Sequence, residues 1–502
     1  MRITVETGDI TTTSSPCIVV NLFEGITVPG GATGAVDHAL DGEIGELIAA
    51  GDISGKSGEL TLLHTFGKIA SPRVLVAGLG KSEDFSIDRV RDLSAAVAKF
   101  LRGKRIARFA TIAHGAGVAG LAPAACAQAI AEGAVLGLYR FDRHKKPDDE
   151  ATEVEAIALV EHDGARLSAM EAAVERGRLA AEAACFARDL ANEPANVLTP
   201  TELAARAEAM ARETGLGCHI YDREWAESMG MGSYLGVARG SAQPPKFIVL
   251  TYQGAGEAPP LGLIGKGITF DTGGISIKPA QGMEEMKGDM SGGACVIAAM
   301  MAIARLKPAI NVTALVPAAE NMPGGNATKP GDVLRAMNGK TIEVINTDAE
   351  GRLILADALA YACKLNLSPL VDVATLTGAM SVTLGNVAYG IFTNSDGLLA
   401  RVQSAGAAAG EKCWQLPMFD EYKENIKSSV ADMKNSGGRG AGSINAAFFL
   451  KEFIDDRPWA HLDIAGVDFF EKDKGVLVKG ASGIPVRTLV NLALDLAATP
   501  LA

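Results

Sequence analysis

The stretch NTDAEGRL, residues 346–353, runs directly into ILADALAYAC, residues 354–363, and this junction decides how the chain is expected to fold. Asp348, Glu350 and Arg352 alternate along its polar part. In an extended backbone alternate side chains point to the same side, so two carboxylates and a guanidinium would converge just before an apolar helix. Such a gathering of charge is costly unless a counter-charge is bound within it. The junction therefore predicts half of a metal site.

Upstream motifs supply the other half. The apolar run LGLI, residues 261–264, continues into GKGITFDTGGISIKP, residues 265–279, which predicts a buried parallel strand that ends in a glycine-rich loop. Ligand sites of open α/β sheets form at such strand ends. With MKGDMSGG, residues 286–293, the motifs provide seven charged side chains: Lys266, Asp271, Lys278, Asp289, Asp348, Glu350 and Arg352.

The side-chain types in this set favour a pair of divalent cations. Three aspartates and one glutamate supply oxygens for two ions about 3–4 Å apart with a shared carboxylate. Because the motifs contain no His or Cys, the site suits Mn²⁺ or Mg²⁺ and does not exclude Zn²⁺. One of the two lysines could lose its proton and bind a metal through a neutral amine. A water between two such ions would be largely hydroxide near neutral pH, which is an effective nucleophile.

The same motifs carry a family resemblance. The chain resembles the leucyl aminopeptidases, the cytosol aminopeptidase family of two-metal exopeptidases, whose hallmark is NTDAEGRL. The likeness covers residues 170–490 and includes RDLANEPANVLTP (188–200), VATLTGA (373–379), GSINAAFFLKEF (442–453) and WAHLDIAG (459–466). It implies a hydrolase that releases N-terminal amino acids, preferentially leucine and other apolar residues, from short peptides by attack of a metal-bridging hydroxide.

The resemblance implies five metal ligands. Asp271 and Glu350 would bridge two ions, either Mn²⁺ or Zn²⁺. Asp348 would complete the ligands of one ion, and Lys266 and Asp289 those of the other.

The remaining site residues would act on the substrate. The resemblance implies that Lys278 polarises the scissile carbonyl and that Arg352 holds a bicarbonate, which offsets its charge and shuttles protons. A free α-amine that binds a metal would fix the first peptide bond over the nucleophile. The residues expected to contact the peptide are Met286, Thr375, Leu376 and Gly378. A pocket with methionine favours leucine-like side chains, but one methylene discriminates weakly, so a dipeptidase of the cysteinylglycine type is the nearest alternative.

Length and composition predict two domains of the α/β class. The chain has 502 residues, which exceeds one ordinary hydrophobic core. The charged stretch HKKPDDEATEVE, residues 144–155, precedes helical spacing that ends at Asn192–Pro194. We therefore expect a smaller N-terminal α/β domain over 1–165 and a joining helix over 166–195. A larger catalytic α/β domain is expected over 196–502, with a mixed, mostly parallel central sheet flanked by helices.

Charge argues against nucleic acid as a partner. Residues 1–165 contain 16 Lys and Arg against 22 Asp and Glu, a net charge of −6, and the whole chain carries −12. Some members of the family also bind DNA through the N-terminal domain, but the electrostatic footprint for phosphate is absent here. A catalytically inactive scaffold is a third alternative. It would not need both Lys278 and Arg352.

The termini and cysteines predict a cytoplasmic protein. The N-terminus lacks the basic region and long apolar region of a signal peptide, and no stretch approaches the roughly 18–20 unbroken apolar residues of a membrane span. Seven cysteines without CxxC spacing predict reduced thiols in place of a disulfide framework. The family resemblance implies a homo-hexamer with enclosed active sites, which would admit short peptides.

Overall fold

The computed structural model describes residues 1–117, 120–146 and 152–501, and the chain divides into two compact units. The first comprises Met1–Glu182 with Lys472–Val478, and the second comprises Ala183–Glu471 with Lys479–Ala502. Helix α5, Leu167–Asn192, runs across this division, where the sequence predicted a joining helix. Residues 147–151 of the charged stretch that placed the predicted boundary lie outside the described residues.

The segment Lys472–Val478 is an excursion that the domain prediction placed with the catalytic residues 196–502. It packs within the first unit. The Lys99 ammonium pairs with Asp473 at 3.0 Å, and the Val476 N–H donates to Asp92 at 3.1 Å. Both contacts are to helix α3 (Ile87–Gly103), and no local pattern in the sequence predicts them.

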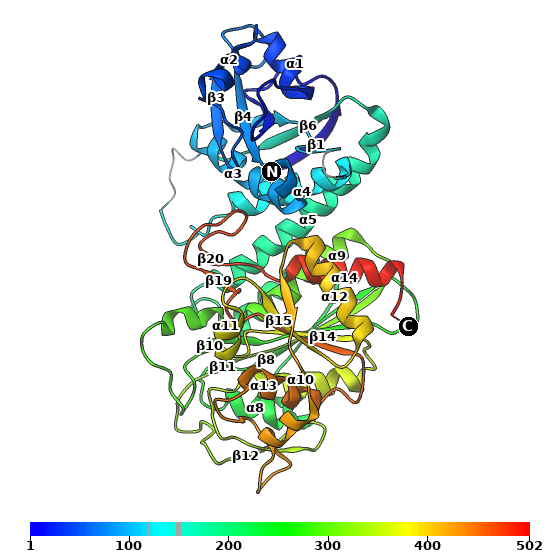
Figure 1. Ribbon diagram of the computed structural model, residues 1–502. Coiled ribbons are helices and arrows are strands. Elements are labelled where there is room, and N and C mark those ends of the chain that lie inside the picture. Colours follow the sequence, from blue (N-terminus) through cyan, green and yellow to red (C-terminus); the bar gives the residue numbers. More distant parts are fainter. Residues whose placement is uncertain (118–119, 147–151, 502) are drawn as a thin grey trace. The chain divides into compact units, whose positions relative to one another are not determined.

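The first unit is a six-stranded sheet with helices on both faces (Figure 1). The strand order is β1-β6-β5-β2-β4-β3, and each neighbouring pair is parallel except β3 and β4. The strands are β1 (Arg2–Thr7), β2 (Ile18–Phe23), β3 (Leu60–His64), β4 (Arg73–Gly80), β5 (Arg108–Thr111) and β6 (Ala156–Glu161). The helices are α1 (Gly31–Ala39), α2 (Glu43–Ala50), α3 (Ile87–Gly103) and α4 (Pro123–Leu138), with short turns η1 (Ser82–Asp84) and η2 (Gly164–Arg166).

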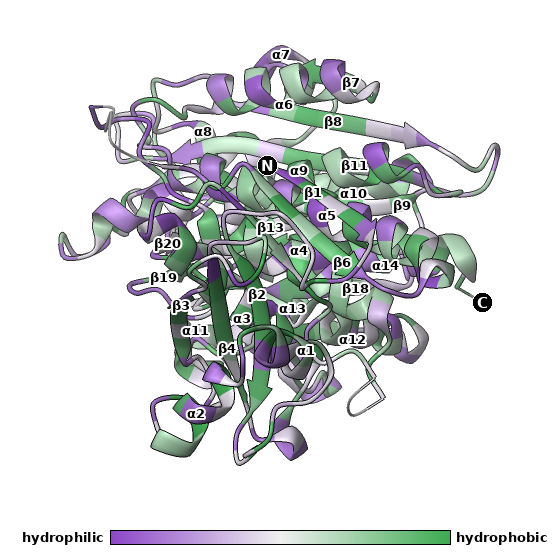
Figure 2. Ribbon diagram, turned by 90° about the horizontal axis from the view of Figure 1, so that it is seen from above, coloured by the Kyte–Doolittle hydropathy of each residue, from purple (hydrophilic) through white to green (hydrophobic). Residues whose placement is uncertain are grey.

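Strand β2 shows why this unit has three layers. Its apolar residues alternate between two cores: Val19 packs with α3 and α4, whereas Ile18 and Val20 pack with α1 and α2. A strand that is apolar on both faces must be covered on both faces. Figure 2 shows the hydrophobic colour along β2 and β4.

The second unit is built on a nine-stranded mixed sheet. The strand order is β16-β15-β18-β14-β9-β11-β8-β7, with β10 paired to β11. The central pairs are parallel, while β8 runs antiparallel to β11 and β15 runs antiparallel to β18. The strands are β7 (Gly217–Tyr221), β8 (Lys246–Gln253), β9 (Leu261–Gly265), β10 (Gly267–Asp271), β11 (Asn311–Asn321), β14 (Leu370–Ala374), β15 (Tyr389–Thr393), β16 (Cys413–Gln415) and β18 (Trp459–Asp463).

Helices cover this sheet in two groups. Helix α9 packs on β9, β11 and β14 together with α6, α12 and α14, while α8, α10 and α13 form the other group with their own core. The helices are α6 (Pro200–Thr214), α7 (Arg223–Ser228), α8 (Gly232–Ala238), α9 (Ser291–Leu306), α10 (Gly351–Lys364), α11 (Gly378–Leu384), α12 (Asp396–Ala409), α13 (Gly442–Lys451) and α14 (Val486–Ala498), with turns η3 (Met283–Gly288) and η4 (Asp420–Ile426). Two small sheets complete the unit: β12 (Val333–Arg335), β13 (Thr341–Glu343) and β17 (Met433–Lys434), and β19 (Phe469–Phe470) with β20 (Gly480–Ala481). The predicted two-domain α/β class with a mixed, mostly parallel sheet is confirmed.

One segment bears on the expectation about membrane-spanning stretches. Among the described residues, Met283–Leu306 is long and apolar enough to cross a membrane by length and composition. Its apolar window is 89% buried inside the fold, because α9 packs between the sheet and α14. The segment therefore has the burial of a core helix.

Candidate active site

Four strands of the second sheet deliver polar residues to one edge. β10 ends at Asp271, β11 at Asn321 and β18 at Asp463, while Thr375 directly follows β14. β10, β11, β9, β14 and β18 are parallel along the sheet, so their carboxyl ends lie at the same edge. The predicted single strand over 261–271 is divided at Lys266, because β9 pairs with both β11 and β14 whereas β10 pairs with β11 alone.

Three carboxylates converge at this edge. Asp271, Asp348 and Glu350 each offer one oxygen, and these oxygens lie within 4.8 Å of one another. The Lys278 ammonium lies 2.7 Å from Asp271 Oδ2 and 2.5 Å from Asp348 Oδ1. The lysine thus bridges a strand end and the NTDAEGRL motif.

Lys266 makes the second link. This side chain is 3% exposed, and its Nζ lies 2.7 Å from Asp289 Oδ1 and 2.8 Å from Glu350 Oε1. It also donates to the Thr375 carbonyl at 2.9 Å. Asp289 Oδ1 accepts a further hydrogen bond from the Thr375 hydroxyl at 2.7 Å, whereas its buried Oδ2 has no hydrogen-bond partner among the described residues.

Two glycines after Asp289, Gly292 and Gly293, allow its side chain to approach Lys266 closely. A Cβ at Gly292 would lie 2.1 Å from the Val373 carbonyl oxygen, and one at Gly293 would lie 3.0 Å from the Lys266 carbonyl oxygen. The Gly293 N–H donates to that same Lys266 oxygen at 2.7 Å. The start of α9 therefore approaches the backbone of the sheet directly, which explains the SGG sequence after Asp289.

The local geometry of NTDAEGRL corrects one expectation. The backbone is not extended: Asp348 lies in a turn, and Glu350 is helical with φ −81° and ψ −33°. The Asp348 N–H donates to Asn346 Oδ1 at 2.9 Å, so an asparagine side chain forms the turn just before α10 begins at Gly351. The carboxylates converge through this turn and not through strand alternation.

Arg352 lies apart from the ion pairs. Its Nη1 donates to the Asn435 carbonyl at 2.8 Å, and its buried Nε has no hydrogen-bond partner in the residues that the structure describes. Burial lowers the pKa of Arg352 to about 10, against the opposing effects of Glu350 and Asp463. The expected convergence of Arg352 with the two carboxylates is therefore not seen as direct contact among the described residues.

Additional positive charge in the cluster would stabilise the ionised forms of its buried carboxylates. Burial raises the pKa of Asp271 and of Asp289, and neighbouring carboxylates raise both further. Burial also raises the pKa of Asp348. Burial alone would lower the pKa of Lys266, but Asp289, Glu350 and Asp271 together raise it above its ordinary value.

The donor set fits divalent cations. The carboxylates of Asp271, Asp289, Asp348 and Glu350 present only oxygen ligands, and the buried Asp289 Oδ2 lacks a hydrogen-bond partner within the described part of the chain. Hard cations prefer such oxygens. Cations here would also relieve the repulsion among the carboxylates.

Two asparagines hold the site and were missed from the sequence. Asn321 Nδ2 donates to Asp271 Oδ1 at 2.7 Å and to the Thr347 carbonyl at 3.0 Å. Asn435, fully buried, donates from Nδ2 to the Asn346 carbonyl at 2.7 Å and accepts the Ile345 N–H at 2.8 Å. Asn321 carried a usable signal, since it ends the apolar run of β11 opposite Asp271.

The residues expected to contact the peptide lie near these elements. Met286 is half-buried in η3, with its carbonyl 3.3 Å from the Asp289 nitrogen. Thr375 and Leu376 are half-buried after β14, and Gly378 is exposed at the start of α11.

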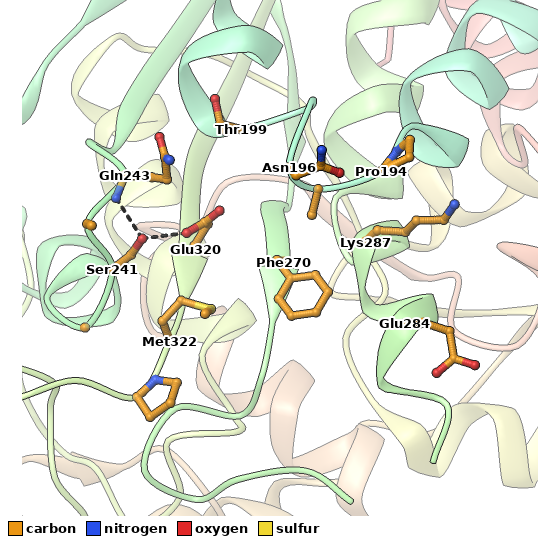
Figure 3. A pocket seen from close by; sticks show the side chains of 14 residues that line it. Pro194, Asn196, Thr199, Ser241, Gln243, Phe270, Glu284, Lys287, Glu320 and Met322 are labelled. Atoms are coloured by element: carbon orange, nitrogen blue, oxygen red, sulfur yellow. Dashed lines mark hydrogen bonds between the residues drawn. The ribbon is translucent and has the colours of Figure 1, made fainter. Parts of the chain in front are cut away.

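A separate pocket lies beside this site (Figure 3). It has a volume of about 840 Å³ and includes Phe270 and Lys287, the neighbours of Asp271 and Met286 in sequence. On its wall Ser241 donates to Glu320 at 2.5 Å. Its lining contains none of the predicted site residues, so it is distinct from the carboxylate cluster.

Comparison with known proteins matches both units. Residues 185–490 match the catalytic domain of the cytosol aminopeptidase family, and residues 19–148 match its N-terminal domain. A probable cytosol aminopeptidase of Solibacter usitatus is 49% identical over 99% of each chain, and one of Geobacter sulfurreducens is 44% identical over 98% of each.

Solved structures agree with this. The bottromycin maturation enzyme BotP, also solved in complex with Mn, is 35% identical with a TM-score of 0.85, covering 96% of this chain and all of its own. A mutant of tomato leucine aminopeptidase is 33% identical with a TM-score of 0.87, covering 99% of this chain and 96% of its own. The chain therefore belongs to the cytosol aminopeptidase family and is an aminopeptidase, a hydrolase of peptide bonds.

Proposed function

We propose that the chain releases leucine and other apolar residues from the N-terminus of short peptides, using two divalent ions at the carboxylate cluster. The observation that carries this proposal is the convergence of Asp271, Asp348 and Glu350 within 4.8 Å beside the unpartnered Asp289 Oδ2. Membership of an aminopeptidase family supports the same reaction.

Five residues would hold the ions. Asp271 and Glu350 would be shared, Asp348 would serve one ion, and Lys266 and Asp289 the other. When bound, the ions act as Lewis acids and lower the pKa of a bound water toward neutrality. Mn²⁺ suits the oxygen-rich set and Zn²⁺ is the alternative; the Mn complex of the related BotP supports the first choice.

The chain's own residues orient and polarise the peptide. Lys278, held by Asp271 and Asp348, would donate to the scissile carbonyl oxygen as negative charge develops there. Arg352 would hold a bicarbonate that moves protons, since its buried Nε has a hydrogen to donate and finds no acceptor in the described ranges. The free α-amine of the substrate would anchor the chain end, while Met286, Thr375, Leu376 and Gly378 contact the first residues.

Hydrolysis of leucine amide tests this proposal. Chelator-stripped protein should be inactive, and Mn²⁺ or Zn²⁺ should restore release of leucine. N-acetyl-leucine amide, with its amine blocked, should be cleaved at least about 100-fold more slowly, because it loses the anchoring that aligns the bond. Equal rates on both substrates would contradict the amine-anchoring part.

The preferred peptide is a second question at the same site. A pocket formed by Met286 discriminates weakly between apolar side chains. Rates on leucylglycine and cysteinylglycine, measured side by side, would decide between a broad aminopeptidase and a cysteinylglycine-type dipeptidase. Leucylglycine is expected to give the higher kcat/KM.

The surroundings of the enzyme follow from the family. The cytosol aminopeptidase relatives support a cytoplasmic location, and the net charge of −12 argues against nucleic acid as a partner. A homo-hexamer is proposed. Exposed apolar side chains such as Trp414 at 67% and Phe419 at 64% support contact with further copies of the chain.

A further inference from the structure

Asp463 ends β18 and is fully buried. Its Oδ1 accepts from the backbone N–H groups of Leu376 at 3.1 Å, Thr377 at 3.4 Å and Ala465 at 3.3 Å, and its Oδ2 accepts from the Thr377 hydroxyl at 2.6 Å. His461 and Arg352 interact with this carboxylate through their charges, while its hydrogen bonds go to residues 376, 377 and 465. The carboxylate therefore acts mainly on residues 375–377, the β14–α11 loop.

The hydroxyl of Thr377 is oriented by this contact. A hydroxyl has one hydrogen, and the bond to Asp463 uses it. Thr377 Oγ1 is then left to accept from Ser443 Oγ at 2.6 Å and from the Met380 N–H at 3.2 Å. The second of these bonds is the N-cap of α11. Asp463 thereby fixes both the loop and the start of the next helix.

The other side of the same loop contacts the proposed metal site. The Thr375 carbonyl accepts from Lys266 at 2.9 Å, and the Thr375 hydroxyl donates to Asp289 Oδ1 at 2.7 Å. Lys266 and Asp289 are the two proposed ligands of one ion. A shift of the loop would move both partners of Thr375 at once.

We propose that Asp463 is a positioning residue that sets the β14–α11 loop, so that Thr375 holds its two partners and the backbone of Leu376 and Gly378 faces the peptide. The peptide part of this inference rests on the proposed function. Replacing a residue that orients metal ligands typically lowers metal affinity or activity by about 10–100-fold.

Two variants separate this role from ordinary burial of a carboxylate. Asp463→Asn keeps the size but offers one acceptor oxygen in place of two, and its NH₂ cannot accept from the loop. Asp372→Asn is the matched control, because Asp372 is also fully buried on neighbouring β14. Its carboxylate contacts Trp459 Nε1 and His461 Nδ1, both at 2.6 Å and both outside the loop.

Thr377 provides a second, milder probe in case Asp463→Asn fails to fold. Thr377→Val removes the hydroxyl that donates to Asp463 and caps α11, whereas Thr377→Ser keeps it. A positioning role predicts that Thr377→Val behaves like Asp463→Asn and that Thr377→Ser restores the wild-type values. A purely structural role would move only the melting temperature.

The experiment measures Mn²⁺ affinity of the chelator-stripped full chain and then kcat and KM for leucine amide at saturating Mn²⁺. We expect Asp463→Asn to weaken Mn²⁺ binding about tenfold or more and to lower kcat/KM at least about tenfold, with Asp372→Asn within about threefold of wild type. Wild-type Mn²⁺ affinity in Asp463→Asn, or equal losses in Asp463→Asn and Asp372→Asn, would overturn the inference.

The two proposals fail in different ways. A wild-type chain that binds Mn²⁺ but cleaves no peptide would refute the proposed function, and the Mn²⁺ titration alone would then decide the role of Asp463. An unchanged Mn²⁺ affinity in Asp463→Asn would refute the positioning role, while wild-type hydrolysis would leave the proposed function standing.

Discussion

At the scale of single residues, amide side chains hold the charged groups of the site in place. The amide of Asn321 contacts both Asp271 and the carbonyl of Thr347, so it joins the β10 strand end to the NTDAEGRL turn. An amide can orient a carboxylate without neutralising it, which leaves that carboxylate available to a cation. Asn435 acts on the backbone instead: its side-chain amide donates to the Asn346 carbonyl at 2.7 Å, and its own backbone carbonyl accepts from Arg352 Nη1 at 2.8 Å.

Replacing Asn321 by Ala should weaken Mn²⁺ binding by about 10–100-fold, because Asp271 would lose its orienting donor. The matched control is Asn311→Ala at the other end of β11, where the amide donates to Gly256 and Ala258, both at 2.8 Å. Titration of the metal-free proteins with Mn²⁺ checks this. Equal affinities for the two variants would contradict it.

Charged residues of the site could be predicted because carboxylates and lysines in three short motifs leave few chemical alternatives. Asn321, Asn435 and Asp463 could not be ranked in this way, since each acts through contacts to residues distant in sequence. An asparagine or aspartate at a strand end is common in loops and caps. Only the fold brings these residues beside the motifs.

At the scale of elements, buried ionisable side chains connect neighbouring helices and loops through hydrogen bonds and ion pairs. Asp357 of α10 is fully buried and accepts the Tyr234 N–H of α8 at 2.8 Å and the Met337 N–H at 2.7 Å. Burial raises the pKa of Asp357 from 3.8 to about 7, although these backbone donors oppose the shift. The carboxyl is therefore protonated more readily in the folded chain than in the unfolded one.

Stability should fall with rising pH through this group. A folded pKa above the unfolded value stabilises the fold at low pH, and this contribution is lost as pH rises from about 4 to about 7. The shift to about 7 corresponds to on the order of 4 kcal/mol over that window. Asp357→Asn should remove this slope in chemical unfolding of the metal-free protein. Parallel pH curves for variant and wild type would contradict it.

The first unit contains a buried ion pair between α3 and α4. Arg91 Nε lies 2.6 Å from Glu132, with side-chain exposures of 4% and 3%. Glu132→Gln leaves Arg91 with only part of its counter-charge and should lower the free energy of unfolding by about 3 kcal/mol. Glu155→Gln, which breaks the exposed pair with Arg108, should cost less than about 1 kcal/mol. Chemical unfolding checks this, and similar losses of unfolding free energy in the two variants would contradict it.

Helices and strands could be predicted from the sequence where the pattern of apolar residues alone distinguishes them. The apolar runs over 261–271 and 354–363 became β9, β10 and α10. The extended backbone expected over Asp348–Arg352 was wrong because the Asn346 side chain closes a turn and the helix begins at Gly351. Pattern does not distinguish a short turn from a short strand when both carry alternating polar residues.

At the scale of the whole molecule, exposed apolar side chains such as Trp414 and Phe419 favour assembly with further copies of the chain, and the net charge of −12 would keep such an assembly soluble. Sedimentation of the protein should give a mass of six chains of 52.0 kDa each. Trp414→Lys places a charge on an exposed apolar position and should shift the population toward smaller species. A monomer at micromolar concentration would contradict the hexamer.

The most direct test of the account measures leucine amide hydrolysis against the number of Mn²⁺ ions bound per chain. The account predicts no activity without metal and full activity only with two ions bound. Asp348→Ala should bind the ions more weakly and lose at least about 1000-fold in kcat, because the reaction depends on the metal-bound nucleophile. Full activity in the stripped protein or in Asp348→Ala would contradict a two-metal aminopeptidase at this carboxylate cluster.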